Sequence, residues 1–234
     1  MLRALIFDVD GTLADTERDG HRVAFNRAFA EAGLPWHWDV ARYGKLLAVA
    51  GGRERILHFI ESDATEIPVA QRDALARDLH ARKTEHYKQL VESGEINLRP
   101  GTARLLNDAW AAELPLAIAT TTSRANVDVL FARTLPAAAE WFEVIATAED
   151  APNKKPDPQV YQYVLERLGL QPDECLAVED SALGLRAALA AGIPTIATVN
   201  DYTRDQDFTG ALVVLNDLNG VSLPQLHAWH ASVL

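Results

Sequence analysis

Near its start the chain reads Ala4-Leu5-Ile6-Phe7-Asp8-Val9-Asp10-Gly11-Thr12-Leu13. The four residues before Asp8 are all apolar, and such a run is typical of a strand that is buried on both faces, as in the middle of a parallel sheet. Because side chains alternate along a strand, we expect Asp8 and Asp10 to lie close together just past its carboxyl end, where ligands bind in open α/β sheets. Gly11 then allows a sharp turn. The stretch therefore predicts a parallel sheet and a site at its edge.

The two carboxylates of this stretch predict a divalent cation. When two such groups are left unpaired at close range they repel each other, and one of them becomes hard to ionise. A divalent cation relieves this repulsion, and oxygen ligands suit Mg²⁺. The same Asp-x-Asp-Gly pattern occurs in calcium-binding loops and in ordinary acidic turns, so by itself it leaves those alternatives open.

The composition is that of an ordinary globular protein, because 48% of the 234 residues are hydrophobic and 24% are charged. A net charge of −11 argues against nucleic acid or an anionic membrane as the main partner. No apolar run is long enough to span a bilayer. The only cysteine, Cys175, cannot form an internal disulfide, which fits a reducing compartment. We therefore expect a cytoplasmic protein, and we expect a monomer.

The spacing of apolar residues divides the chain into two parts. Residues 15–96 contain no strand-like run, and helical spacing predicts helices near 23–32, 53–61 and 69–91. From residue 98 onward strands and helices alternate, with strands predicted at 116–119, 144–146, 176–178, 195–199 and 212–215, and helices at 102–112, 124–133, 158–168 and 182–191. Asp157 before Pro158 and Ser181 are predicted N-caps of the last two helices. The predicted fold class is α/β: a doubly wound, Rossmann-like parallel sheet core (residues 1–14 and 97–234) with an inserted all-helical cap (residues 15–96).

Three later strand ends also carry polar motifs, namely Thr120-Thr121-Thr122-Ser123, Lys154-Lys155-Pro156 and Glu179-Asp180-Ser181. The Thr120 hydroxyl, together with backbone N–H groups that lead into a helix, predicts an anion site. Lys155, held by the following proline, offers a fixed positive charge beside a phosphate. A helix N-cap accounts for one of the two acids in the last motif but not for both. Taken singly, the first two motifs also fit a threonine-rich turn and a surface lysine pair.

In this order and on successive strand ends, the four motifs resemble those of the haloacid dehalogenase-like hydrolases, and the resemblance covers the whole chain. It implies that Asp8 is the nucleophile, which forms an aspartyl-phosphate. It implies that Asp10 is the general acid that protonates the leaving oxygen and then the base that activates water. Thr120 and Lys155 would hold the transferring phosphoryl oxygens. The implied Mg²⁺ ligands are Asp8, the backbone carbonyl of Asp10, Asp180 and, directly or through water, Glu179.

The resemblance further implies that the helical insertion closes over the site and selects the substrate. The paired glycines of its Gly51-Gly52-Arg53-Glu54-Arg55 segment allow a close backbone approach, and an arginine fork can grip a second phosphate. These features resemble in particular the Calvin-cycle-associated xylulose-1,5-bisphosphate phosphatases, which usually have Lys at the position of Arg53. The residues implied to bind substrate are Glu17, His21, Gly51, Gly52, Arg53, Arg55, Arg82, Lys83, Thr121 and Thr122.

We therefore predict a Mg²⁺-dependent sugar (bis)phosphate phosphatase that hydrolyses the 1-phosphate of xylulose-1,5-bisphosphate to give xylulose 5-phosphate. Lys155 would bind the phosphate that is cleaved, and Arg53 and Arg55 would bind the distal one. One alternative is a β-phosphoglucomutase-type isomerase, which passes the phosphate to a sugar phosphate instead of to water. A second is a phosphoglycolate-type phosphatase, which would not need the distal arginines. A regulatory protein that kept the fold and lost the chemistry is disfavoured because all four motifs are intact.

Overall fold

The computed structural model of the protein describes residues 1–233 and divides into two compact units. The core unit consists of Met1–Asp15 and the chain from Asn97 onward, and the helical unit is Thr16–Ile96. All the strands named below belong to the core unit. The helical unit therefore interrupts the chain shortly after the first strand.

The core unit is built on a six-stranded parallel sheet with the strand order β3-β2-β1-β4-β5-β6. The strands are β1 (Ala4–Phe7), β2 (Leu116–Ala119), β3 (Phe142–Ala146), β4 (Cys175–Glu179), β5 (Thr195–Thr198) and β6 (Val214–Leu215). Every residue of β1 is buried. Phe7 lies beside Ile118 of β2 and Val178 of β4, so the carboxyl ends of these three strands meet at one edge of the sheet. The prediction of a buried central parallel strand is confirmed.

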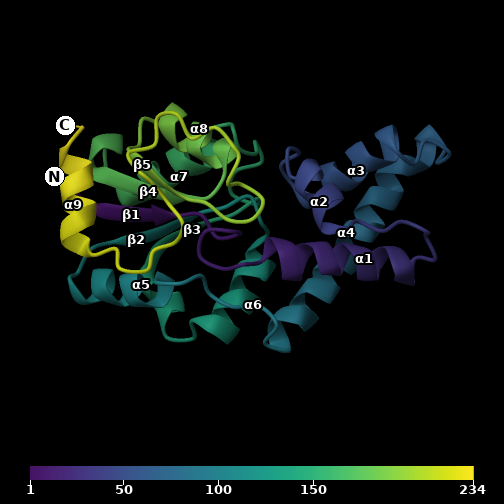
Figure 1. The fold of residues 1–234 in the computed structure, drawn as a ribbon, viewed down its shortest axis with the longest axis horizontal. Helices are drawn as coiled ribbons and strands as arrows, with labels where there is room; N and C mark the ends of the chain where they lie inside the picture. Colours follow the sequence, from purple (N-terminus) through teal and green to yellow (C-terminus); the bar gives the residue numbers. More distant parts are fainter. Residues whose placement is uncertain (234) are drawn as a thin grey trace. The chain divides into compact units, whose positions relative to one another are not determined.

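Helices cover both faces of this sheet, which confirms the predicted doubly wound α/β fold (Figure 1). Figure 1 shows α5 and α6 on one face and α7 and α8 on the other. The helices of the core unit are α5 (Thr102–Ala111), α6 (Arg124–Thr134), α7 (Gln159–Leu168), α8 (Ala182–Ala190) and α9 (Leu223–Ala231). On the face of α7 and α8, small strand residues such as Ala117 and Ala177 pack in one buried cluster with Tyr161 and Val164 of α7. This packing brings α7 close to the sheet, next to the predicted site.

The two predicted helix N-caps have different outcomes. The side chain of Ser181 accepts a hydrogen bond from the Gly184 N–H at 3.1 Å, which confirms it as the N-cap of α8. The assignment of Asp157 is wrong by one residue, because Pro158 is the N-cap of α7 and its carbonyl accepts the first helical bonds. Asp157 still accepts a hydrogen bond from the Gln159 N–H at 2.9 Å. Its carboxylate thus stabilises the turn that precedes α7.

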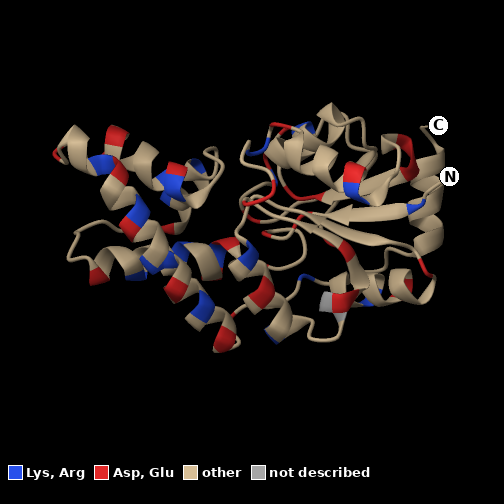
Figure 2. Ribbon diagram, turned by 180° about the vertical axis from the view of Figure 1, so that it is seen from behind, with Lys and Arg blue, Asp and Glu red and all other residues tan. Residues whose placement is uncertain are grey.

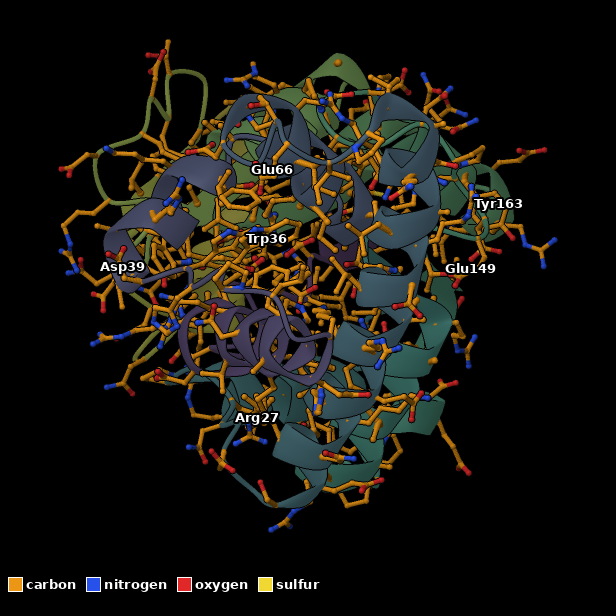
Figure 3. All side chains as sticks on the ribbon, turned by 90° about the vertical axis from the view of Figure 1, so that its right-hand side faces the viewer. Arg27, Trp36, Asp39, Glu66, Glu149 and Tyr163 are labelled. Atoms are coloured by element: carbon orange, nitrogen blue, oxygen red, sulfur yellow. The ribbon has the colours of Figure 1, made fainter. Side chains whose placement is uncertain are left out.

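The helical unit consists of a π-helical turn (Glu17–His21) and four helices, α1 (Arg22–Glu31), α2 (Val40–Leu46), α3 (Gly52–Ser62) and α4 (Val69–Glu92). Aromatic rings from α1, α2, α3 and the segment between α1 and α2 pack together in its interior. The ring of Trp36 (labelled in Figure 3) packs edge-on against that of Phe59, with 5.2 Å between the ring centroids. The ring of Trp38 packs edge-on against that of Phe29, with 4.8 Å between the centroids. The sequence analysis did not predict α2, which is short and contains a glycine but is capped by Asp39. Among the described helices, none combines the length and apolar character needed to cross a membrane.

Candidate active site

The edge where the central strands end gathers three of the predicted motifs. Asp8 follows β1, Thr120 follows β2, and Asp180 follows β4, and all three side chains are buried. Asp10 lies half-buried in the turn that follows β1. The structure therefore places these residues at neighbouring strand ends, as the sequence analysis expected.

Lys155 lies at the centre of this group, in the loop that connects β3 to α7. Its ammonium donates hydrogen bonds to Asp8 Oδ1 at 2.7 Å, to Glu179 Oε1 at 2.5 Å and to the carbonyl of Ala119 at 2.9 Å. Lys155 and both carboxylates are buried. Burial alone would lower the pKa of Lys155, but the carboxylates of Asp8 and Glu179 raise it, so the lysine is a permanent positive charge.

The carboxylates of Asp8, Glu179 and Asp180 form a buried cluster that fits a metal cation. Each offers one oxygen, and these oxygens all lie within 4.8 Å of one another. Burial and the negative charges of Glu179 and Asp10 raise the pKa of Asp8, and the positive charge and hydrogen bond of Lys155 lower it. The net effect is a pKa raised to about 8. A cation bound to this cluster would relieve the excess of negative charge, and oxygen donors suit a hard divalent ion.

Asn200 orients one acid of this cluster and was not predicted. Its side-chain amide donates a hydrogen bond to Asp180 Oδ2 at 2.7 Å. Gly11 makes room for this contact, because a Cβ atom at Gly11 would lie 2.3 Å from the same oxygen, and its φ of +85° also favours glycine. A sequence signal existed, because Asn200 directly follows the strand that the sequence predicts at 195–199.

Arg99 is a second residue to which the sequence analysis assigned no role, and it joins several loops at the same edge of the sheet. Its buried guanidinium donates to the carbonyls of Val199 at 2.6 Å and Asn216 at 2.7 Å, and also to the carbonyl of Gly11. These bonds hold the turn after Asp10 against the end of β5. The spacing of residues could not predict these contacts, because the partners of Arg99 are far away along the chain.

The loop after β2, Thr120–Ser123 (the threonine loop), leads into the N-terminus of α6, as predicted. The Thr120 hydroxyl accepts a hydrogen bond from the Thr122 N–H at 3.2 Å, and the Thr122 hydroxyl accepts one from the Asn126 amide at 2.9 Å. Ser123 caps α6 directly after this loop. Thr121 and Thr122 are half-buried. Hydroxyl and backbone N–H groups are therefore concentrated beside Asp8, where an anion would be bound.

In the helical unit, two of the predicted substrate-binding residues are linked through a residue that was not predicted. The hydroxyl of Tyr43 donates a hydrogen bond to Glu17 and accepts one from Arg55 at 2.9 Å. The Arg55 guanidinium also donates to the carbonyls of Leu46 at 3.1 Å and Val49 at 3.2 Å, and it is buried. Tyr43 belongs to α2, the helix that the sequence analysis did not predict, so this link could not be anticipated.

His21 and Lys83 form a second buried pair in the helical unit. The Lys83 ammonium lies 2.9 Å from His21 Nδ1, and it lies over the rings of Phe25 at 5.2 Å and Tyr87 at 5.1 Å. Aromatic faces attract the ammonium and keep it in place. The structure therefore brings together His21 and Lys83, which are far apart in the sequence.

The remaining predicted residues of the helical unit lie in other surroundings. Arg82 is ion-paired with Glu31 at 2.6 Å and with Asp78 at 2.8 Å. Arg53 is exposed and lies 3.9 Å from Asp73, in keeping with the interspersed acidic and basic positions along these helices (Figure 2). Gly51 has a φ of +94° at the start of α3, and at Gly52 a Cβ atom would lie 2.7 Å from the ring of His80. The two glycines therefore allow the tight backbone turn at the start of α3. A role for Arg53 and Arg82 in substrate binding remains a prediction.

Comparison with known proteins identifies close relatives. A family model described as haloacid dehalogenase-like hydrolase matches residues 2–192. The chain is 47% identical to the plasmid-encoded protein CbbY of Cupriavidus necator, with all of this chain and 98% of the relative covered. The crystal structure of CbbY from Rhodobacter sphaeroides in complex with phosphate is 41% identical and has a TM-score of 0.88, with 97% of this chain and 100% of that chain covered. A mutant of the same CbbY in complex with xylulose-(1,5)bisphosphate is 42% identical and has a TM-score of 0.87, with 95% and 97% covered.

Proposed function

The chain belongs to the haloacid dehalogenase-like hydrolases, and on that premise we propose that it is a Mg²⁺-dependent phosphatase that removes the 1-phosphate of xylulose-1,5-bisphosphate. Its relatives make it a phosphatase of phosphorylated sugars. The observation that carries the proposal is the buried contact between Asp8 and Lys155 beside the acids that end β4. The complex of the related CbbY with xylulose-(1,5)bisphosphate supports the choice of sugar.

In the proposed reaction Asp8 attacks the phosphorus atom. The hydrogen bond from Lys155 fixes Oδ1, so that Oδ2 can form the new bond to phosphorus while the bond from phosphorus to the sugar oxygen breaks. Asp10 gives its proton to the leaving sugar oxygen. A water molecule then attacks the phosphorus, Asp10 takes up its proton, and the bond to Asp8 breaks to release inorganic phosphate.

The charges of the site fit this phosphoryl transfer. Lys155, the Thr120 hydroxyl and the backbone N–H groups of the threonine loop would bind the phosphoryl oxygens, which carry the negative charge of the transition state. Asp8, Asp180 and the backbone carbonyl of Asp10 would hold Mg²⁺, with Glu179 reaching it directly or through water. When bound, the cation offsets the repulsion between the carboxylate nucleophile and the phosphate dianion.

We propose that the helical unit provides the residues that bind the distal phosphate. Arg55 is the best candidate, because its bonds to Tyr43, Leu46 and Val49 fix the plane of its guanidinium in advance. A guanidinium held in this way loses little side-chain entropy when it binds a phosphate. Lys83, fixed by His21 and two aromatic rings, is a second preorganised positive charge.

Arg55→Ala is expected to weaken the binding of bisphosphates and to spare small monophosphates. Loss of a charge-assisted hydrogen bond should raise KM for a sugar bisphosphate by about tenfold or more, with little change for phosphoglycolate. Arg77→Ala is the matched control, because Arg77 is exposed on α4 and pairs with Asp73. Thermal unfolding would be recorded for both variants, since Arg55 is buried. Equal losses on both classes of substrate would show that Arg55 does not recognise a distal phosphate.

The proposed function is tested by inorganic phosphate release with Mg²⁺ on a small panel of substrates. The panel contains xylulose-1,5-bisphosphate, ribulose-1,5-bisphosphate, fructose-1,6-bisphosphate, β-glucose-1-phosphate and phosphoglycolate. We expect a preference for xylulose-1,5-bisphosphate of several orders of magnitude in kcat/KM. Formation of glucose-6-phosphate from β-glucose-1-phosphate, without phosphate release from any substrate, would instead identify a mutase.

A further inference from the structure

Glu179 is held in one position by contacts on every side. Its side chain is fully buried, and Oε1 accepts hydrogen bonds from the Lys155 ammonium at 2.5 Å and from the Tyr161 hydroxyl at 2.6 Å. Its other oxygen accepts from the Asp180 N–H at 3.2 Å. Gly184 of α8 lies against the carboxylate so closely that a Cβ atom there would be 2.0 Å from it. The carboxylate is therefore directed at Lys155 and has little space in which to rotate.

Tyr161 contacts both members of the Glu179–Lys155 pair, and the proposed reaction does not use it. The residue is fully buried in α7, its hydroxyl bonds Glu179, and the ammonium of Lys155 lies 5.2 Å from the centre of its ring. Burial and the charge of Glu179 raise the pKa of Tyr161, so its phenol stays protonated and donates the hydrogen bond. A neutral donor at this place steadies the carboxylate without adding charge to the site.

We propose that Tyr161 is a positioning residue of the phosphatase reaction, whose hydroxyl holds the Glu179 carboxylate against Lys155 and thereby keeps the Lys155 ammonium directed at Asp8. The inference rests on the proposed function, because Lys155 and Asp8 are its reacting groups. It also assigns Glu179 a specific task, which is to orient the lysine.

Loss of the Tyr161 hydroxyl would act on turnover more than on substrate binding. Glu179 Oε1 would keep its negative charge but would lose the hydrogen bond from Tyr161. Its attraction for the Lys155 ammonium would then become stronger and would draw the ammonium away from Asp8. Lys155 would then stabilise the charge on the transferring phosphoryl group less well. An interaction that is used mainly in the transition state changes kcat, whereas uniform binding changes KM.

The test compares Tyr161→Phe with Tyr163→Phe, with p-nitrophenyl phosphate as substrate and saturating MgCl₂. The first variant keeps the ring over Lys155 and removes only the hydroxyl. The second removes a hydroxyl from the same helix, because Tyr163 (labelled in Figure 3) is half-buried and hydrogen-bonds Asp150 instead. We expect Tyr161→Phe to lower kcat by about tenfold, with KM within about twofold of the wild type. Tyr163→Phe should match the wild type in both constants.

A double-mutant cycle identifies the residue through which Tyr161 acts. In a Glu179→Gln background, Tyr161→Phe should lower kcat by less than about twofold, because the group it positions has already lost its charge. An undiminished tenfold effect in that background would contradict the proposal. Unchanged kcat in Tyr161→Phe would overturn it as well. So would a higher Mg²⁺ concentration for half-maximal activity at an unchanged kcat, since Tyr161 would then support metal binding and not Lys155.

A crystal structure of Tyr161→Phe tests the positioning without turnover, and thermal unfolding would first show that the variant is folded. We expect Lys155 Nζ to move toward Glu179 and out of hydrogen-bond distance of Asp8. An unmoved Lys155 would contradict the proposal even if the wild-type protein released no phosphate. Failure of the wild type to hydrolyse any phosphate ester would instead refute the proposed function and leave the positioning to be decided by this structure.

Discussion

Asp8→Asn is expected to lower phosphate release by about 10⁴-fold or more while the protein stays folded. An amide oxygen is too weak a nucleophile to attack phosphorus, so the covalent step is lost. The amide still offers an oxygen to the Lys155 ammonium, and the exchange removes one carboxylate from a crowded cluster whose oxygens lie within 4.8 Å. The melting temperature should therefore be unchanged or higher. The measurement is steady-state phosphate release together with thermal unfolding.

Asp128→Asn is the matched control for this prediction, because Asp128 is exposed on α6 and pairs with Arg124 at 2.7 Å. Its turnover should equal that of the wild type. In acid-quenched samples, mass spectrometry should detect one phosphoryl group on the peptide that contains residue 8 of the wild type and none on that of Asp8→Asn. Turnover of Asp8→Asn within tenfold of the wild type would rule out Asp8 as the nucleophile.

Removal of divalent cations with EDTA is expected to lower turnover by about 10³-fold or more, and Mg²⁺ should restore it. The structural reason is that burial, together with the negative charges of Glu179 and Asp10, raises the pKa of Asp8 to about 8, and a bound cation would oppose this rise. A carboxylate that is partly protonated is a poor nucleophile. A bound cation should also stabilise the fold, because it binds the folded site and not the unfolded chain. Addition of MgCl₂ should therefore raise the melting temperature.

Asp180→Asn separates a specific site from a general salt effect. The variant removes one carboxylate of the cluster and keeps the shape of the side chain. Its melting temperature should respond less to MgCl₂ than that of the wild type, and its turnover should need more Mg²⁺. Full turnover of the wild type after chelation would contradict a metal-dependent mechanism. Higher turnover with Ca²⁺ than with Mg²⁺ would contradict the choice of metal.

The strand ends of the core were predictable because a local pattern determines them. A continuous apolar run predicts a buried parallel strand, and the direction of the strand places the polar residue that follows it at the carboxyl edge of the sheet. Asp8, Thr120 and Asp180 could therefore be assigned to one edge before any coordinates were known, and the structure places them there. The same rule would have identified Asn200, which follows β5.

Capping positions were less predictable than the helices themselves. Both Asp157 and Ser181 have side chains that can cap a helix, but only Ser181 does so, because Pro158 occupies the cap of α7. Helix α2 was missed because seven residues with an internal glycine show no clear helical period. Because α2 was not predicted, neither was the role of its residue Tyr43, which links Glu17 to Arg55. Short elements depend on tertiary contacts that a local pattern does not contain.

By itself, the sequence determined the fold class, the alternation of strands and helices in the core and the strand ends that carry the candidate site, since these follow from apolar periodicity and chain direction. Only the tertiary structure decided which side chains meet. It joined Lys155 to Glu179 and Tyr161, and it buried Arg55 while leaving Arg82 in surface ion pairs. The physical reason is that such contacts depend on how helices pack on the sheet and on one another. That packing brings together residues far apart in the sequence, and no spacing along the chain encodes it directly.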